Sequence, residues 1–306
     1  MKHATLELTY DHRPSALPYM VRAVMPVRRR IDLSPPISAN WRRHRPDPHD
    51  LAAFERITGL ATRRDPMTTP TTLPLLYPHT FGFRLAMAIL THPRFPVPIW
   101  GVLQTRNHLV QHRPIAVGAA LDFETRVRPG RVVPKGAEFD LHTTVHVDGT
   151  LAWESVVTFF TRGRFGEPDA PSPHTRSPIE FGSRVAEWRM PDADHVRFGR
   201  FTGDYNGIHL WDWYARRMGF PRALYHPQRV LGQCLGRLPG LTPRDGSAEA
   251  PLRLDAWIKG PVPHDSSVRL HVATTIAPAT STFALFADDE ERPAVVGRLH
   301  ATESSS

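Results

Sequence analysis

Residues 201–209 have the sequence FTGDYNGIH, and the interpretation of the whole chain starts from this stretch. It places a carboxylate, Asp204, and an imidazole, His209, five residues apart in a turn-rich segment. Taken singly, Asp204 and Asn206 are typical of turns, because both side chains cap backbone amides. His209 alone is typical of a buried, hydrogen-bonded histidine. In the order GDxNxIH, followed by YAxxxGF at residues 214–220, they together indicate a functional site.

The segments around this stretch are predicted to be helical. Residues 192–200 look like a helical turn that ends at Thr202-Gly203-Asp204. Residues 212–218 have the pattern of a second helix, closed by Gly219 in a typical C-terminal position. An apolar helical run opens at His226-Pro227-Gln228 and extends over residues 229–238.

The composition is that of a globular protein. The chain has 306 residues, of which 41% are hydrophobic, so one large domain or two ordinary ones can form a substantial core. It contains no run of about 18 apolar residues, which argues against a membrane span, and residues 1–20 lack the apolar core of a signal peptide. Cys234 is the only cysteine, which excludes an internal disulfide, and we expect it to be a small core residue. We expect a cytoplasmic protein.

The charge is strongly basic. The formal net charge is +8, and only three of the 38 basic residues are lysines. The runs Arg28-Arg29-Arg30 and Arg42-Arg43-His44-Arg45 have three possible roles: nucleic-acid contact, attraction of an acidic carrier protein or coenzyme A phosphates, or a solvated basic face. No recognisable nucleic-acid module accompanies them, so we expect no nucleic-acid partner.

A Pro- and Gly-rich segment divides the chain. Residues 163–173 have no apolar periodicity and are typical of a linker. The predicted division is a first unit at residues 1–165, a linker at 166–178 and a second unit at 179–306.

Each unit repeats the same order of elements, a short apolar helix followed by four strands with alternating polarity. In the first unit the helix is predicted at residues 81–90 and the strands at 100–110, 120–127, 138–147 and 152–161, with a hairpin turn at Asp148-Gly149. In the second unit the strands are predicted at 252–259, 268–276, 282–287 and 294–302. No strong residue-level repeat connects the units, so the duplication rests on element order. We predict an α+β fold of two antiparallel sheets, each wrapped around a central helix and joined edge to edge, which removes two exposed edges.

The order of residues 203–220 resembles the signature of the MaoC-like (R)-specific enoyl-thioester hydratases and 3-hydroxyacyl-thioester dehydratases. The sequence TRNHLVQHRPI at residues 105–115 resembles the strand after the central helix in the two-unit bacterial dehydratases. The resemblance covers the chain from about Asp50 onward and implies a double hotdog fold. It also implies that the first unit is degenerate and houses the acyl tail, while the second carries the motif.

The resemblance further implies reversible syn hydration of a trans-2-enoyl thioester carried by coenzyme A or by an acyl carrier protein. Asp204 and His209 match the family's catalytic pair, and Asn206 would orient them. No metal or organic cofactor is implied, because the thioester stabilises the adjacent carbanion. Residues near the motif are the candidate substrate-binding groups: Gly203, Tyr205, Tyr225 and His226.

Two positions depart from the family pattern. The family's oxyanion-hole glycine, which donates its backbone N–H, corresponds to Pro227, and proline has no N–H. Gly207 stands where the family usually has proline. Either Gln228 replaces the missing donor through its N–H or its side-chain amide, or hydration is lost and the protein binds acyl thioesters as a catalytically weakened accessory subunit. Thioesterase activity is a third possibility, by fold analogy alone.

Other candidate sites are weaker. His108 and His112 would share one face of a strand, but no carboxylate signal lies near them, so we expect no metal site. A chain with two units can be complete as a monomer, and a homodimer is the alternative.

Overall fold

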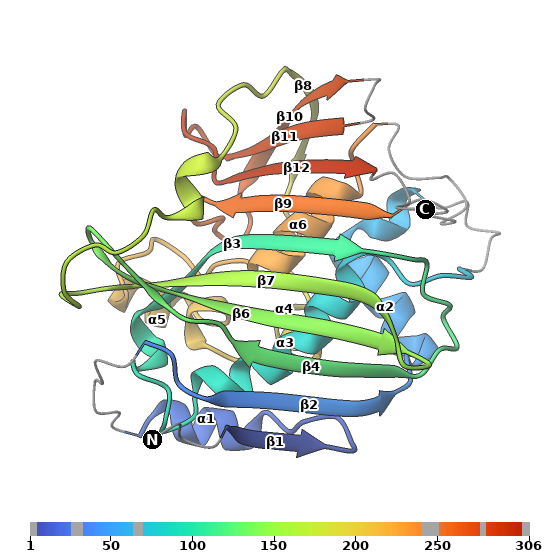
Figure 1. Ribbon diagram of the computed structural model, residues 1–306. Coiled ribbons are helices and arrows are strands. Elements are labelled where there is room, and N and C mark those ends of the chain that lie inside the picture. The colour runs from blue at the N-terminus through green and yellow to red at the C-terminus, as the bar shows by residue number, and fades with distance from the viewer. Residues whose placement is uncertain (1–4, 26–32, 64–69, 240–250, 276–279, 302–306) are drawn as a thin grey trace.

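The structure is a computed structural model that describes residues 5–25, 33–63, 70–239, 251–275 and 280–301. One twelve-stranded sheet dominates it, in the order β1-β2-β4-β6-β7-β3-β9-β12-β11-β10-β8, with β5 paired to β6 (Figure 1). The strands are β1 (Leu6–Tyr10), β2 (Ile37–His44), β3 (Val102–Gln111), β4 (Leu121–Val127), β5 (Arg131–Val133), β6 (Gly136–Val147), β7 (Thr150–Arg162), β8 (Ser183–Arg189), β9 (Leu252–Ile258), β10 (Ser267–Thr275), β11 (Thr280–Ala287) and β12 (Val295–Ala301).

The helices lie against one face of this sheet (Figure 1). They are α1 (Leu17–Ala23), α2 (Pro48–Thr58), α3 (Leu76–Leu90), α4 (His195–Thr202), α5 (Asp212–Arg217) and α6 (Pro227–Leu235), with short 3₁₀ turns η1 (Leu60–Arg63), η2 (Ile99–Gly101), η3 (Pro173–Arg176) and η4 (Gly207–His209).

The two halves meet edge to edge, as predicted. Strand β3 pairs antiparallel with β9, in a register that runs from Arg106 opposite Trp257 to Gln111 opposite Leu252. Among the described strands, those before residue 163 lie on one side of this junction and those after residue 182 on the other. The pairing is antiparallel throughout except between β1 and β2, which run parallel.

The central helices of the two halves are α3 and α6. All fifteen residues of α3 are buried, as are all residues of α6 except Pro227. Helix α3 begins five residues before the predicted start, because Pro78 falls in its first turn, where a missing N–H costs no hydrogen bond. Helix α6 ends three residues before the predicted end, at its C-cap Gly236.

The predicted strands are confirmed to within two residues where the structure describes them; the predicted ends Ile276 and Thr302 lie outside the described residues. Asp148 and Gly149 both have positive φ, 51° and 73°, which is the type I′ hairpin geometry expected. Strands β1, β2, β5 and β8 and helices α1 and α2 were not predicted.

The segment predicted as a linker packs against the sheet. Its turn η3 places the Pro173 carbonyl where Trp257 Nε1 donates to it, 3.2 Å away, and His174 Nδ1 lies 3.2 Å from the Thr105 carbonyl oxygen. The connection is therefore tied to the strands of both halves, although the predicted boundaries at 166 and 178 remain a prediction.

Helices α2 and α4 end alike, a repeat that sequence analysis did not find. Residues 54–59 are FERITG and residues 198–203 are FGRFTG. Each helix is closed by its glycine at φ 75° and 74°, and in each the threonine hydroxyl donates to the carbonyl four residues earlier. The core helices also begin alike, with Leu-Tyr-Pro at 76–78 and Leu-Tyr-His-Pro at 224–227.

The basic run at 42–45 does not form one solvated face. The arginines at 42, 43 and 45 are exposed, but His44 is buried in β2, and its ring stacks with those of Tyr77 and Phe81. Burial lowers the pKa of His44 to about 3, so this residue is a neutral core group. Arg28-Arg29-Arg30 lies outside the described residues.

Candidate active site

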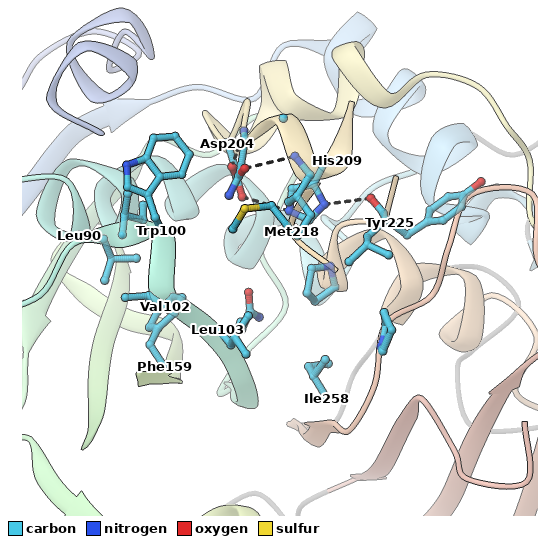
Figure 2. A pocket seen from close by; sticks show the side chains of 18 of the residues that line it. Leu90, Trp100, Val102, Leu103, Phe159, Asp204, His209, Met218, Tyr225 and Ile258 are labelled. Carbon is cyan, nitrogen blue, oxygen red and sulfur yellow. Dashed lines mark hydrogen bonds and ion pairs between the residues drawn. The ribbon is translucent and has the colours of Figure 1, made fainter. Parts of the chain in front are cut away.

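A cavity of about 810 Å³ lies between the two halves (Figure 2). Its wall on one side is apolar and comes from α3 and β3, including Phe83, Met87 and Leu90. The opposite wall is the turn after α4 together with the first residues of α6. In Figure 2, Asp204 and His209 lie between Leu90 and Trp100 on one side and Tyr225 on the other.

The turn that carries Asp204 is fixed by local chemistry. Helix α4 ends at Gly203, where a side chain would be strained at φ 74° and would press on Arg84 at 3.1 Å. The Asp204 N–H donates to Thr202 Oγ1 at 3.1 Å, and Asp204 Oδ1 accepts from the Asn206 N–H at 3.0 Å. The turn therefore uses one carboxylate oxygen and leaves Oδ2 facing His209.

His209 is held by its other ring nitrogen. Asn206 Oδ1 accepts from the Ile208 N–H at 3.2 Å and so begins the 3₁₀ turn η4. His209 Nδ1 donates to the Leu224 carbonyl at 2.9 Å, which leaves a lone pair on Nε2 when the ring is neutral. Nε2 lies 3.6 Å from Asp204 Oδ2. The two atoms that face each other are then both acceptors, so a water beside them can donate to both, and a substrate hydroxyl can donate to either.

His226 supports this pair from behind. Its ring stacks on His209 with centroids 3.9 Å apart, and its Nε2 donates to the Asp204 backbone carbonyl at 3.1 Å. Burial holds the pKa of His226 well below its usual value, so it is neutral. His226 is not among the described residues that line the cavity, so it positions the pair rather than offering a contact to substrate.

The N-terminus of α6 faces the cavity through Pro227 and Gln228. Pro227 is the first helical residue, where proline is well tolerated but provides no donor. Gln228 is 1% exposed and lines the cavity, and its side-chain Nε2 is buried without a hydrogen-bond partner. An unpaired buried amide costs about 1–3 kcal/mol, so this group is available to a ligand.

The remaining predicted site residues belong to the cavity wall. Gly203, Tyr205 and Asn206 line the cavity. Tyr225 also lines it, but its hydroxyl points away and donates to the Pro191 carbonyl, and burial raises its pKa to about 12. The Tyr225 ring, rather than its hydroxyl, is what the cavity offers.

Arg84 of α3 is a site residue that sequence analysis missed. It is 4% exposed, and its guanidinium donates to the carbonyls of Phe201 and Arg200 at the end of α4 and to that of Pro14. A cation at a helix C-terminus is favourable, and here it comes from the other half of the molecule. Arg84 therefore holds the turn that begins at Gly203. A buried arginine has no periodicity that could have predicted this contact.

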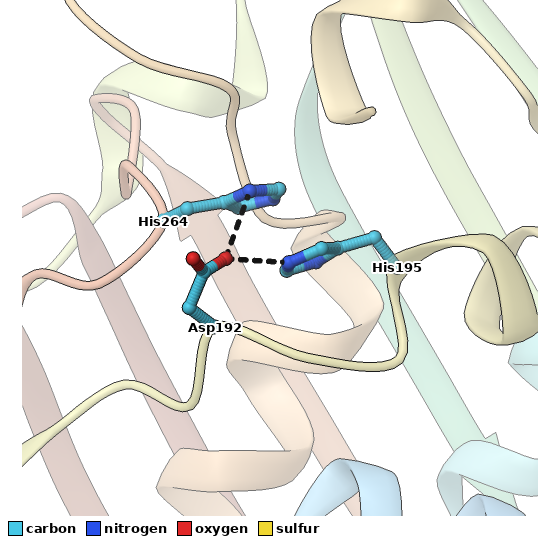
Figure 3. A group of neighbouring side chains, drawn as sticks. All are labelled: Asp192, His195 and His264. Carbon is cyan, nitrogen blue, oxygen red and sulfur yellow. Dashed lines mark hydrogen bonds and ion pairs between the residues drawn. The ribbon is translucent and has the colours of Figure 1, made fainter. Parts of the chain in front are cut away.

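Asp192, His195 and His264 form a second cluster (Figure 3), and the rings of both histidines pack against the edge of the Tyr225 ring. His195 Nε2 donates to Asp192 Oδ1 at 2.9 Å, because Nδ1 accepts from Arg229 at 3.2 Å. The two imidazole rings stack 3.5 Å apart at 10°, so their in-plane lone pairs cannot meet at one ion. The same argument applies to the stacked rings of His209 and His226, and neither group suits a metal ion.

The weaker candidate residues, Cys234, His108 and His112, are not part of the cavity lining. Cys234 is fully buried, and burial raises its pKa to about 12, which agrees with a core role. His108 pairs with Asp255 at 2.8 Å and His112 with Glu154 at 3.1 Å, so the two histidines do not share a site.

No family model matches the chain. It is 31% identical over 234 residues to 3-hydroxyacyl-thioester dehydratase X of Mycobacterium tuberculosis, an alignment that covers 76% of this chain and 81% of the relative. The chain belongs to the MaoC-like 3-hydroxyacyl-thioester dehydratase family. This bears out the resemblance found at residues 203–220.

Solved structures show the same fold. HtdX of Mycobacterium tuberculosis matches with a TM-score of 0.69 at 24% identity, over 87% of this chain and 100% of that chain. A MaoC-like dehydratase from Phytophthora capsici matches with a TM-score of 0.64 at 18% identity, over 89% and 98%. A conserved Mycobacterium tuberculosis protein described as a double hotdog matches with a TM-score of 0.57 at 17% identity, over 84% and 92%. The predicted double hotdog fold is confirmed. No helix in the described part of the chain is long and apolar enough to cross a membrane.

Proposed function

We propose that this protein catalyses the reversible dehydration of 3-hydroxyacyl thioesters, equivalent to the hydration of trans-2-enoyl thioesters, with Asp204 and His209 as the acid/base pair. One observation carries the proposal. Asp204 Oδ2 and His209 Nε2 face each other at 3.6 Å beside a largely apolar cavity, where both can hydrogen-bond to one water or substrate hydroxyl.

The reaction needs two proton transfers at one place. In hydration, the water held by the pair loses a proton to one of the two groups while its oxygen bonds to C3 of the enoyl chain. The C2=C3 π bond breaks, and the proton taken from the water is passed through the pair to C2, so both groups end in the state in which they began. Because both groups flank one point, hydroxyl and proton add to the same face. Asn206 orients the pair, since its N–H holds Asp204 Oδ1 and its side chain starts the turn that carries His209.

The thioester oxygen needs a donor while negative charge develops on it. Pro227 cannot supply one, and Gln228 is the nearest alternative at the start of α6. Its buried, unpaired Nε2 supports a role as the oxyanion donor, with the positive end of the helix behind it.

The cavity lining supports an orientation for the substrate. The acyl chain would lie against the apolar wall of the N-terminal half, residues 1–165, formed by Phe83, Met87 and Leu90. The second half, residues 179–306, would supply the catalytic groups. Lys259 and His174 also line the cavity and could meet the polar arm of coenzyme A or of an acyl carrier protein.

A catalytically weakened acyl-thioester binder is the second candidate, and Pro227 at the start of α6 is the observation that favours it. The two functions differ in turnover but not in ligand.

Enoyl-thioester hydration is the direct test. Loss of enoyl absorbance is followed with crotonyl-CoA and with longer enoyl-CoA, for the native protein and for Asp204→Asn. The control is Asp192→Asn, which alters the exposed carboxylate of the second cluster. We expect Asp204→Asn to lower kcat about 100- to 10,000-fold and the control to leave it unchanged. Binding without turnover would favour the second candidate, and release of free thiol would instead identify a thioesterase.

A further inference from the structure

Helix α1 turns its large apolar side chains toward solvent. Leu17, Met20, Val21 and the C-cap residue Val24 follow the i, i+3, i+4, i+7 spacing of one helix face, and each is 48–73% exposed. The opposite side buries Tyr19, whose ring lies beside Gly203. A surface helix usually directs such an apolar stripe toward the core, so we expect this face to contact another apolar environment.

Exposed tryptophans from both halves extend this surface. The ring of Trp100 in η2 contacts that of Tyr214, with centroids 6.4 Å apart. Tyr214 contacts Trp213 at 5.6 Å, and Trp213 contacts Trp211 at 6.2 Å. These tryptophans are 39–63% exposed. Helices α1 and α5 lie at the same end of the sheet (Figure 1).

This surface surrounds the cavity. Met20, Val24, Trp100, Trp211 and Met218 all line the cavity and are all exposed. We call the exposed apolar set the apolar rim; its members are Leu17, Met20, Val21, Val24, Trp100, Trp211, Trp213 and Met218. Contiguous exposed apolar surface of this kind marks a binding face.

Positive charge borders the apolar rim. The guanidinium of Arg22 in α1 lies over the Tyr19 ring, 5.8 Å from its centroid, and Arg94, four residues after α3, is exposed. On α5, Arg217 is exposed one turn after Trp213, whereas the exposed Arg216 pairs with Asp212 at 3.4 Å. Residues 17–25 contain no carboxylate, which favours an anionic partner.

We propose that the apolar rim docks on an anionic lipid surface. Leu17, Val21 and the tryptophans enter the interfacial region, where tryptophan is preferred, and the arginines meet anionic headgroups. An acyl chain then passes from the lipid phase into the cavity without crossing water. An acidic carrier protein would engage the arginines but would leave Val21 and Trp213 in water, so the lipid surface accounts for more of the rim.

Vesicle co-sedimentation tests this proposal, with phosphatidylcholine vesicles compared with vesicles that also contain phosphatidylglycerol. The test variant is Val21→Glu, in the rim but outside the cavity lining. The matched control is Val196→Glu, an exposed valine of α4 that is neither a member of the rim nor part of the cavity lining. We expect the native protein and the control to bind anionic vesicles, and Val21→Glu and Trp213→Ala to bind at least about tenfold more weakly.

Three outcomes would overturn the proposal. The native protein does not sediment with anionic vesicles, or the two valine variants lose binding equally. Alternatively, Val21→Glu splits a dimer during lipid-free ultracentrifugation, which would make the rim an interface between copies. Vesicle binding needs no turnover, so its result is independent of the proposed reaction. Val21→Glu should keep the native kcat on a short, soluble enoyl thioester.

Discussion

Helices α2 and α4 end in the same way, yet only α4 is followed by a titratable pair. Both end in F-x-R, an apolar residue, Thr and a left-handed glycine. After Gly59 the chain continues with Leu60, whereas after Gly203 it continues with Asp204. The shared turn is therefore a structural element of the fold, and the chemistry lies in the residues after the glycine.

The two turns are also held in the same way, each by the core helix of the other half. Arg84 of α3 donates to the Phe201 carbonyl, and Gln233 of α6 donates to the Ile57 carbonyl. Arg84 and Gln233 both stand six residues after the first-turn proline of their helix, and both carbonyls stand two residues before the glycine. This internal symmetry gives the positions around the catalytic turn matched control positions in the other half.

The largest effect is expected where the halves differ most. Asp204→Leu makes the C-terminal turn like the N-terminal one and should lower kcat about 1000-fold, because general acid–base catalysis is lost. The matched change Leu60→Asn alters the corresponding position beyond the cavity lining and should leave kcat unchanged. Turnover of an enoyl thioester by both variants measures this. An equal loss in the two would mean that Asp204 acts only through the fold.

The next effect concerns the starts of the core helices. Gln228→Met should lower kcat about 100-fold, because the proposed oxyanion donor is removed. Pro227→Gly in that background restores a backbone N–H at the family position and should recover part of the rate. The control is His79→Met, since His79 also follows a first-turn proline and has a buried, unpaired Nε2, but does not line the cavity. No loss in Gln228→Met would assign the oxyanion to another donor.

A smaller effect is expected from the crossed supports. Arg84→Met leaves three carbonyls without their donor and should lower the free energy of unfolding by about 2 kcal/mol. It should also lower kcat about tenfold, because the turn carrying Asp204 loosens. Gln233→Met should cost stability without changing kcat. Urea unfolding and turnover assays separate these effects, and a native kcat in Arg84→Met would limit Arg84 to a structural role.

The smallest effect on activity is expected at the junction of the halves. Burial raises the pKa of Asp255, but the hydrogen bond from His108 and the charges of Arg253 and Arg106 outweigh it and lower the pKa to about 2. A depressed carboxyl pKa stabilises the fold above the unfolded value, near 4, and this contribution is lost as pH falls toward 2. Asp255→Asn should therefore cost about 2 kcal/mol at pH 7, and the difference in urea midpoint should shrink below pH 4. A pH-independent difference would contradict this.

Local patterns predicted much of the fold. Alternation along β6 and the Asp148-Gly149 turn depend only on neighbouring residues, so the hairpin between β6 and β7 could be read from the sequence. The repeat at the ends of α2 and α4 was missed for two reasons. Only four of its six positions agree, and the spacing to the core helix differs: Tyr77 lies 18 residues after Gly59, whereas Tyr225 lies 22 residues after Gly203.

The candidate site was predictable only in part. Asp204 and His209 are close in sequence, and the structure brings their side chains together at 3.6 Å. The supports of the site come from distant segments: Arg84 lies 117 residues from Phe201, and no periodicity predicts such a contact. The contact of His226 was also not predictable, because its ring stacks on His209 only when the start of α6 packs against the turn η4.

The central claim is that Asp204 and His209 act as one unit on a single water or hydroxyl. A double-mutant cycle of Asp204→Asn, His209→Gln and the combined variant, measured as kcat for enoyl-thioester hydration, tests it most directly. We predict that the combined variant is no slower than the slower single variant, since groups that act as a unit give strongly non-additive losses. Losses that multiply would show two independent contributions and contradict the account.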